Sequence, residues 1–146
     1  MPSLAMLNGQ LDACTGHMAE LERNIEDLSE FRHEVSMSSG YFQDQLFDRI
    51  CVVQRAAEVP GVRIGQKYAE RMGDHLRCEM GWRVSMVFDD IEDRVRSMQY
   101  RLEDELEQER LRASWLRDEI RAERVRERAE QVRLEAEEQA RRRAML

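Results

Sequence analysis

Residues 4–28 have the sequence LAMLNGQLDACTGHMAELERNIEDL. Mostly large apolar residues recur in this stretch at alternating steps of three and four positions: Leu4, Leu7, Leu11, Cys14, Met18, Leu21, Ile25 and Leu28. Because a strand repeats every two residues, this heptad spacing predicts an α-helix with one apolar seam. The residues that flank the seam are polar but mostly uncharged. Such flanks fit either a plain two-helix seam or a third helix that covers it.

The seam continues to a single strong stop signal. Phe31 and Val35 extend it, and after the helix-weakening segment 36–40, where we expect a kink or short break, helical spacing resumes at Phe42, Leu46, Ile50, Val53 and Ala57. The segment Glu58-Val-Pro-Gly61 then ends the pattern, because Pro60 disfavours helix at Val59 and Gly61 gives the chain turn freedom. We expect a first helix over about 3–57 and a turn over 58–64.

A second apolar stripe begins after this turn and predicts a second long helix from about residue 65. Its members are Tyr68, Met72, Leu76, Met80, Val84, Val87, Ile91, Val95, Met98, Leu102 and Leu106. Gly73 and Gly81 interrupt it, and no glycine or proline follows Gly81. Two helices joined by one tight turn run antiparallel, and the simplest pairing sets Leu7 opposite Trp115.

The fold class predicted from these stripes is all-α. We expect an antiparallel, coiled-coil-like hairpin over residues 1–120 and a charged helical extension over 121–146, because large apolar residues become sparse after Ile120. The extension is rich in Arg and Glu. Its thin stripe of Ala and Val fits either a solvated helix held by ion pairs or a docking stripe for a partner helix.

Composition excludes several classes of protein. The 146 residues include 30 acidic and 23 basic side chains, a formal charge of −7, which argues against a nucleic-acid surface. No apolar run reaches the length of about 18 residues that a membrane span needs. The N-terminal residues lack the basic and apolar regions of a general secretory signal.

Residues that could carry chemistry are scattered. Glu30 and His33 have the Glu-x-x-His spacing of di-iron bundles, but no second such pair exists, and His75 with Cys78 supplies only two ligands. The three cysteines, Cys14, Cys51 and Cys78, fall in or beside the apolar stripes and are interpreted as small core residues. We therefore predict no catalytic residue, no cofactor and no metal site, and a protein that is not an enzyme.

The order long helix, glycine-containing turn, long helix over residues 1–105 resembles the small helical-hairpin proteins of type VII secretion, especially those associated with toxins. The segment Leu21–Leu28 would belong to the first helix of that family, and Arg63-Ile-Gly65 stands where the family has its Trp-x-Gly turn. Tyr100-Arg-Leu-Glu-Asp104 fits the family's Tyr-x-x-x-Asp/Glu export motif, so the resemblance implies that Tyr100 and Asp104 form an export signal.

The resemblance implies a partner, chaperone or targeting factor for a type VII secreted toxin, forming a homodimeric or heterodimeric four-helix bundle in a bacterium. Such a protein would be cytoplasmic or secreted by the type VII pathway. The alternatives are a self-associating coiled-coil scaffold and, less favoured, a helical enzyme with a metal site in its bundle. The residues expected to bind the partner are those of both stripes: Leu4, Leu7, Leu11, Met18, Leu21, Ile25, Leu28, Tyr68, Met72, Leu76, Val87 and Ile91.

Overall fold

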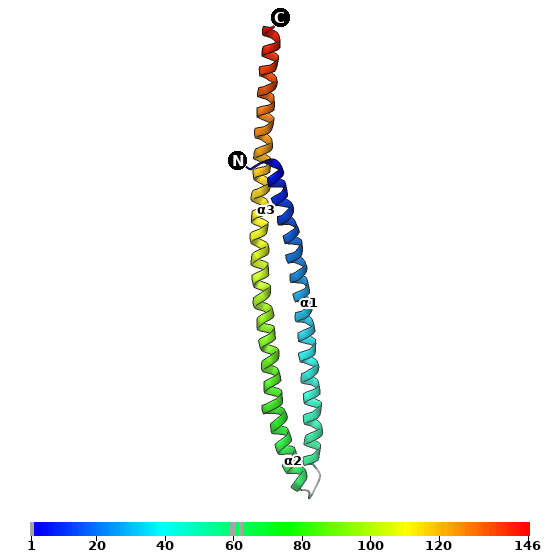
Figure 1. Ribbon diagram of the computed structural model, residues 1–146. Coiled ribbons are helices and arrows are strands. Elements are labelled where there is room, and N and C mark those ends of the chain that lie inside the picture. Colours follow the sequence, from blue (N-terminus) through cyan, green and yellow to red (C-terminus); the bar gives the residue numbers. More distant parts are fainter. Residues whose placement is uncertain (1, 59–60, 62) are drawn as a thin grey trace. The chain divides into compact units, whose positions relative to one another are not determined.

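The structure, a computed structural model, describes residues 2–58, 61 and 63–146. It contains α1 (Leu4–Ala57), α2 (Arg63–Asp74), the π-helix η1 (His75–Gly81) and α3 (Trp82–Ala144) (Figure 1). No β-strand occurs in these residues. The all-α prediction is therefore confirmed for the part of the chain that the structure describes.

The first helix begins at a serine cap. The hydroxyl of Ser3 accepts a hydrogen bond from the backbone N–H of Met6, at 3.2 Å between N and Oγ, which satisfies one of the free donors of the first turn. The helix then runs through residues 36–40 without a break. Gly61 has φ +78°, the left-handed conformation that glycine adopts most readily. Of the predicted turn 58–64, Val59, Pro60 and Val62 lie outside the described residues.

The chain divides into two compact units, and each is described by itself. Unit 1 combines the described residues of 1–24 with 102–146, and unit 2 comprises the described residues of 25–101. Each unit therefore contains part of α1 and part of α3.

The core of unit 1 joins the start of α1 to the middle of α3. It contains Leu7 and Cys14 from α1, and Ala113, Leu116 and Ile120 from α3. Leu4, Leu11 and Met18 pack against this cluster. The predicted pairing of Leu7 with Trp115 is wrong by one position, because Leu116 is completely buried whereas Trp115 is 57% exposed.

In unit 2, α1 packs along the segment that begins at α2. The rings of Phe42 and Phe88 lie 6.2 Å apart between centroids, and the side-chain amide of Gln43 donates to the hydroxyl of Ser85 at 2.9 Å. Val35 is buried, but Phe31 is 45% exposed and the half-buried Arg32 takes the next place in the seam. The expectation that Phe31 extends the seam is therefore wrong.

The π-helix η1 changes the phase of the second stripe. The backbone hydrogen bonds of a π-helix join residues that are five positions apart, rather than the four of an α-helix. The two buried residues of η1, Leu76 and Gly81, are separated by the same five positions. The side that packs on α1 therefore passes from Leu76 to Gly81, Phe88 and Val95, and not to the predicted Met80 and Val87. Val87 is 58% exposed. The predicted stripe therefore leaves the seam at Met80 and Val87 and rejoins it at Val95 and Leu106, which are 7% and 6% exposed.

Gly81 should be the least replaceable glycine of unit 2. A Cβ atom at this position would lie 2.7 Å from the carbonyl oxygen of Leu76 and 2.8 Å from Cδ2 of Leu46, whereas a Cβ at Gly73 would have nothing within 4 Å. We expect Gly81→Ala to lower the free energy of unfolding by about 1–3 kcal/mol, a typical cost of overpacking. Gly73→Ala should raise it by up to about 1 kcal/mol, because alanine favours helix. Urea unfolding of both variants tests this, and equal effects would contradict the π-helical geometry.

The last part of α3 in unit 1 is a solvated helix. Every residue from Arg124 to Leu146 is exposed, including Val125 at 66% and Val132 at 65%. Ion pairs one turn apart join Arg142 to Glu138 at 2.7 Å and Arg133 to Glu137 at 3.9 Å. Exposed pairs of this kind contribute at most a few tenths of a kcal/mol each.

Because residues 124–146 bury no apolar side chain, the fold should not depend on them. We expect deletion of 124–146 to leave the melting midpoint nearly unchanged and to lower the helical circular dichroism roughly in proportion to the residues removed. The helicity lost on deletion should be smaller in 1 M salt, which screens ion pairs. A midpoint that falls by many degrees would contradict this, because residues 124–146 would then take part in a packed interface.

Candidate functional site

Unit 2 has an uncharged line of side chains beside the seam of α3. Three residues of this line stand immediately before half-buried residues of the seam: Val84 before Ser85, Ile91 before Glu92 and Met98 before Gln99. Met80 and Val87 fill the gaps at helical spacing. Met80, Val87 and Met98 are 41%, 58% and 43% exposed. In a two-helix coiled coil the positions that flank the seam usually carry charges. Here they are apolar; Val84 and Ile91 are half-buried, and the other three are exposed.

A matching uncharged line runs along α1. Phe31, Ser38, Gln45 and Val52 repeat every seven residues, each one position before a seam residue. Val52 lines a hollow of about 330 Å³ together with Tyr68 and Met72, so the lines of α1 and α2 open on the same side of unit 2. We call this surface the uncharged face; its residues are Phe31, Ser38, Gln45, Val52, Tyr68, Met72, Met80, Val84, Val87, Ile91 and Met98.

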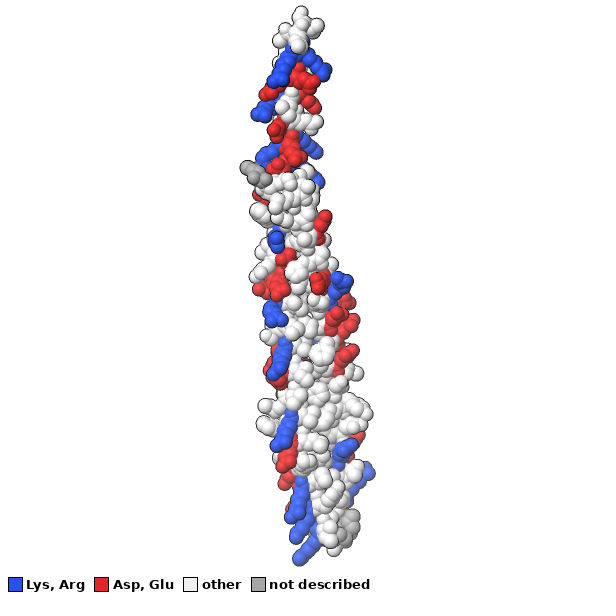
Figure 2. Space-filling model, in the orientation of Figure 1, with Lys and Arg blue, Asp and Glu red and all other residues white. Residues whose placement is uncertain are grey.

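On α3 the uncharged line is confined to unit 2. At the equivalent positions of α3 in unit 1 the residues are Glu105, Arg112 and Glu119. Figure 2 shows a broad, mostly white area in its lower half, with blue and red side chains at both margins. A surface of this kind, apolar in the middle and charged at its margins, is typical of protein-interaction sites.

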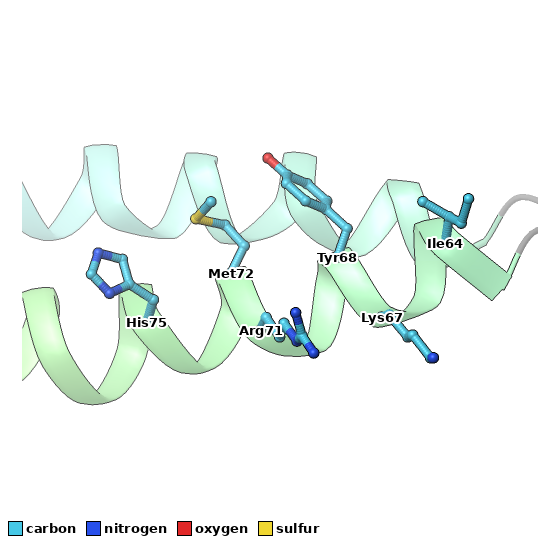
Figure 3. Close-up of a pocket in the computed structure, with 6 residues that line it drawn as sticks. All are labelled: Ile64, Lys67, Tyr68, Arg71, Met72 and His75. Carbon is cyan, nitrogen blue, oxygen red and sulfur yellow. The ribbon is translucent and has the colours of Figure 1, made fainter.

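The face ends in a second hollow on α2 and η1. It measures about 490 Å³ and is lined by Ile64, Lys67, Tyr68, Arg71, Met72 and His75. Figure 3 shows Ile64, Tyr68 and Met72 projecting to one side of the helix and Lys67 to the other. His75 lies 2.9 Å from the carboxylate of Glu79, between Nδ1 and Oε2. The hollow adds apolar surface to the face, with cations at its edge.

The residues predicted to bind a partner fall into three groups in the structure. Leu7, Leu21 and Leu76 are buried within the chain itself. Tyr68 and Val87 are exposed and belong to the uncharged face. The remaining seven are half-buried: Leu4, Leu11, Met18, Ile25, Leu28, Met72 and Ile91. Three further aromatic residues that are not among these twelve, Tyr41, Phe47 and Trp82, are 67%, 66% and 60% exposed.

Unit 1 contains a small polar cluster inside its seam. The thiol of Cys14 donates a hydrogen bond to the carboxylate of Glu109, with 2.9 Å between Sγ and Oε2, and His17 Nδ1 lies 3.6 Å from Oε1 of the same carboxylate. Burial, followed by the hydrogen bond to Glu109, raises the pKa of Cys14. The hydrogen bond from Cys14, with His17 and Arg112 nearby, lowers the pKa of Glu109. A raised pKa makes a thiol less nucleophilic, because less of it is present as thiolate at neutral pH.

The lowered pKa of Glu109 makes this cluster sensitive to acid. A carboxylate whose pKa is lower in the folded chain stabilises the fold above its unfolded pKa of about 4.3, and that stability is lost as the pH falls through the folded value. Glu109→Gln keeps an acceptor for Cys14 but removes the charge. We expect it to cost stability at pH 7 and progressively less below pH 4, measured by urea unfolding. A cost that is the same at pH 7 and pH 3 would contradict the assignment.

The other residues that could bind a metal or take part in chemistry are scattered. No group of three or more His, Cys, Asp or Glu side chains that could hold a metal ion occurs among the described residues. All three cysteines are free, and Cys78 is exposed, so the interpretation of Cys78 as a core residue is wrong. Tyr100 is 65% exposed in α3. Asp104, also in α3, accepts a hydrogen bond from Gln108 at 3.3 Å.

Comparison with known proteins gives no relative: no family model, no curated protein and no solved structure matches the chain. Within the described residues, no helix has the length and apolar character needed to cross a membrane.

Proposed function

We propose that this protein is a non-enzymatic helical interaction protein that receives partner helices on the uncharged face of unit 2. In each unit the two helical segments run antiparallel, as a coiled-coil hairpin requires, and residues 121–146 form a separate helical extension. Two contacts in unit 2 support this direction. Phe42 of α1 lies against Phe88 of α3, whereas the next residue of α1, Gln43, bonds to Ser85, so the α3 numbers fall as the α1 numbers rise.

The main support for the proposal is that residues beside the seam are apolar. In a hairpin without a partner, charged residues would be expected at these positions. Val87, Met98 and Tyr68 remain 58%, 43% and 50% exposed beside a seam that is already complete. Full burial of one such side chain is worth roughly 1.5–3 kcal/mol. A partner that covers the face would gain that energy from several side chains together.

Within this class, a partner or chaperone of a type VII secreted toxin is the more specific proposal. It rests on the resemblance of residues 1–105 to the helical hairpins of that system, including Arg63-Ile-Gly65 at the turn and Tyr100 with Asp104 as an export motif. The coiled-coil scaffold is the second candidate, and it is favoured by the charge pattern around the uncharged face that is described below.

The test places a photo-crosslinking amino acid at Val87, on the uncharged face. The matched control carries it at Asp93, an exposed position on the same helix and outside the face. After irradiation in the native bacterium, mass spectrometry identifies the adducts. We expect protein adducts at position 87 and few at 93, and a secreted toxin with a helical N-terminal domain among them would support the type VII assignment. Equal labelling at both positions, or none, would overturn the proposed function.

A further inference from the structure

We propose that the occupant of the uncharged face is a second copy of this chain, packed with its helices parallel to those of the first about a two-fold axis along the helices. This inference rests on the proposed function, because it names the partner of the same surface. It is carried by the charges at the two borders of the face.

The borders carry opposite charges. On α1, Asp27 and Glu34 stand immediately before the seam residues Leu28 and Val35. On α3, Arg94 stands immediately before Val95, and Arg101 follows one heptad later. The face therefore has an acidic border, Asp27 and Glu34, and a basic border, Arg94 and Arg101.

The two borders are level with each other. The hydrogen bond from Gln43 to Ser85 and the close approach of Leu46 to Gly81 indicate the register of the two helices in unit 2. In this register Glu34 stands at about the same height as Arg94. Asp27, one heptad earlier on α1, is level with Arg101. One heptad in the other direction, the residues in the border positions are uncharged: Tyr41 and Val87, which are 67% and 58% exposed.

This arrangement is self-complementary in one orientation only. When two copies face each other about an axis along the helices, α3 of one copy lies over α1 of the other at the same height. Arg94 then meets the partner's Glu34, Arg101 meets the partner's Asp27, and Val87 meets the partner's Tyr41, each contact occurring twice. When the copies run in opposite directions, α3 lies over α3, and arginine borders face each other. Like charges across an interface are repulsive, so the borders select the parallel dimer.

The pairs set orientation, and the apolar side chains supply most of the affinity. Arg94 is 79% exposed on its side chain and pairs with Asp90 of its own helix at 3.1 Å. An exposed pair of this kind exchanges readily for another, so it leaves Arg94 available for the partner's carboxylate. The dimer would close the face as a four-helix layer with apolar residues between two rows of ion pairs.

The experiment uses the full chain and sedimentation velocity over a range of concentrations. The wild type should approach twice its mass of 17.3 kDa as concentration rises. Arg94→Glu alone and Glu34→Arg alone should each raise the dimer Kd by about tenfold, because each replaces two attractive pairs with two repulsive ones. An equimolar mixture of the two variants should regain dimer close to the wild-type level, because every pair in the mixed dimer is again opposite in charge. Asp93→Arg, outside the face, should leave the Kd unchanged.

The outcomes separate this inference from the proposed function. A wild type that stays monomeric, or a mixture that dimerises no better than its components, overturns the parallel dimer. If the photo-crosslinker at position 87 then captures a different protein, the uncharged face remains a partner site and only its occupant was wrongly assigned. If adducts are absent there as well, both proposals fail.

Discussion

Leu116→Ala should lower the free energy of unfolding by about 2–5 kcal/mol, the range measured when a buried leucine is cut back to alanine. Leu116 is completely buried and lies in the cluster with Leu7, Cys14, Ala113 and Ile120. The cost has two parts, the apolar contacts that are lost and the cavity that a rigid two-helix seam cannot fill by collapse. Urea unfolding, followed by circular dichroism, measures it.

Trp115→Ala is the matched control, because it removes a larger side chain from the next position on the same helix. Trp115 is 57% exposed. Its truncation should cost less than about 1 kcal/mol, as for most surface substitutions. The order of the two effects is the informative result. If Trp115→Ala were the more damaging change, the seam of unit 1 would run one position earlier than the structure has it.

Leu116 and Trp115 also show which features of the fold can be predicted from the sequence. A period of three and four residues identifies helices and their apolar faces, and the all-α class follows from it. The period does not state which of two adjacent apolar faces meets the other helix. On α3, Val84, Val87 and Ile91 form as regular a line as Ser85, Phe88 and Glu92, and the line that packs on α1 is the less apolar of the two. Hydrophobicity therefore favours the line that lies beside the seam, where Val84 and Ile91 are half-buried and Val87 is exposed.

The π-helix is the physical reason for this error. In an α-helix, Met80, four residues after Leu76, would lie on the side that packs on α1. In η1 the turn is wider, and Gly81 lies on that side instead. In the sequence, Gly81 interrupts the apolar stripe, whereas the close approach of Leu46 and of the Leu76 carbonyl at this position requires a residue without a side chain. The sequence sign of this change is Gly81, which Gly73 precedes by eight residues in the same helical segment.

On α1 the same limitation is milder. The strict heptad from Leu7 through Cys14, Leu21 and Val35 is the buried line, and the sequence predicts all four residues. Between Leu28 and Val35 an apolar Phe31 competes with Arg32, and hydrophobicity favours Phe31. The structure half-buries Arg32 instead, which long basic side chains permit because their methylene groups are apolar. Phe31 is thereby left for the uncharged face.

Leu21→Asp should be the most damaging single substitution in α1, with a loss of at least about 4 kcal/mol, because it removes a leucine and places a carboxylate where little water can reach it. Leu21 is 3% exposed. Ala19→Asp introduces the same side chain at an exposed position two residues away and should cost less than about 1 kcal/mol, the difference in helix propensity. Burial raises the pKa of an aspartate, so the folded variant holds its proton to higher pH than the unfolded chain. The deficit of Leu21→Asp should therefore shrink as the pH falls from 8 to 4, while that of Ala19→Asp should not. Thermal and urea unfolding at both pH values test this, and a deficit independent of pH would mean that position 21 is hydrated in the folded chain and does not belong to the seam.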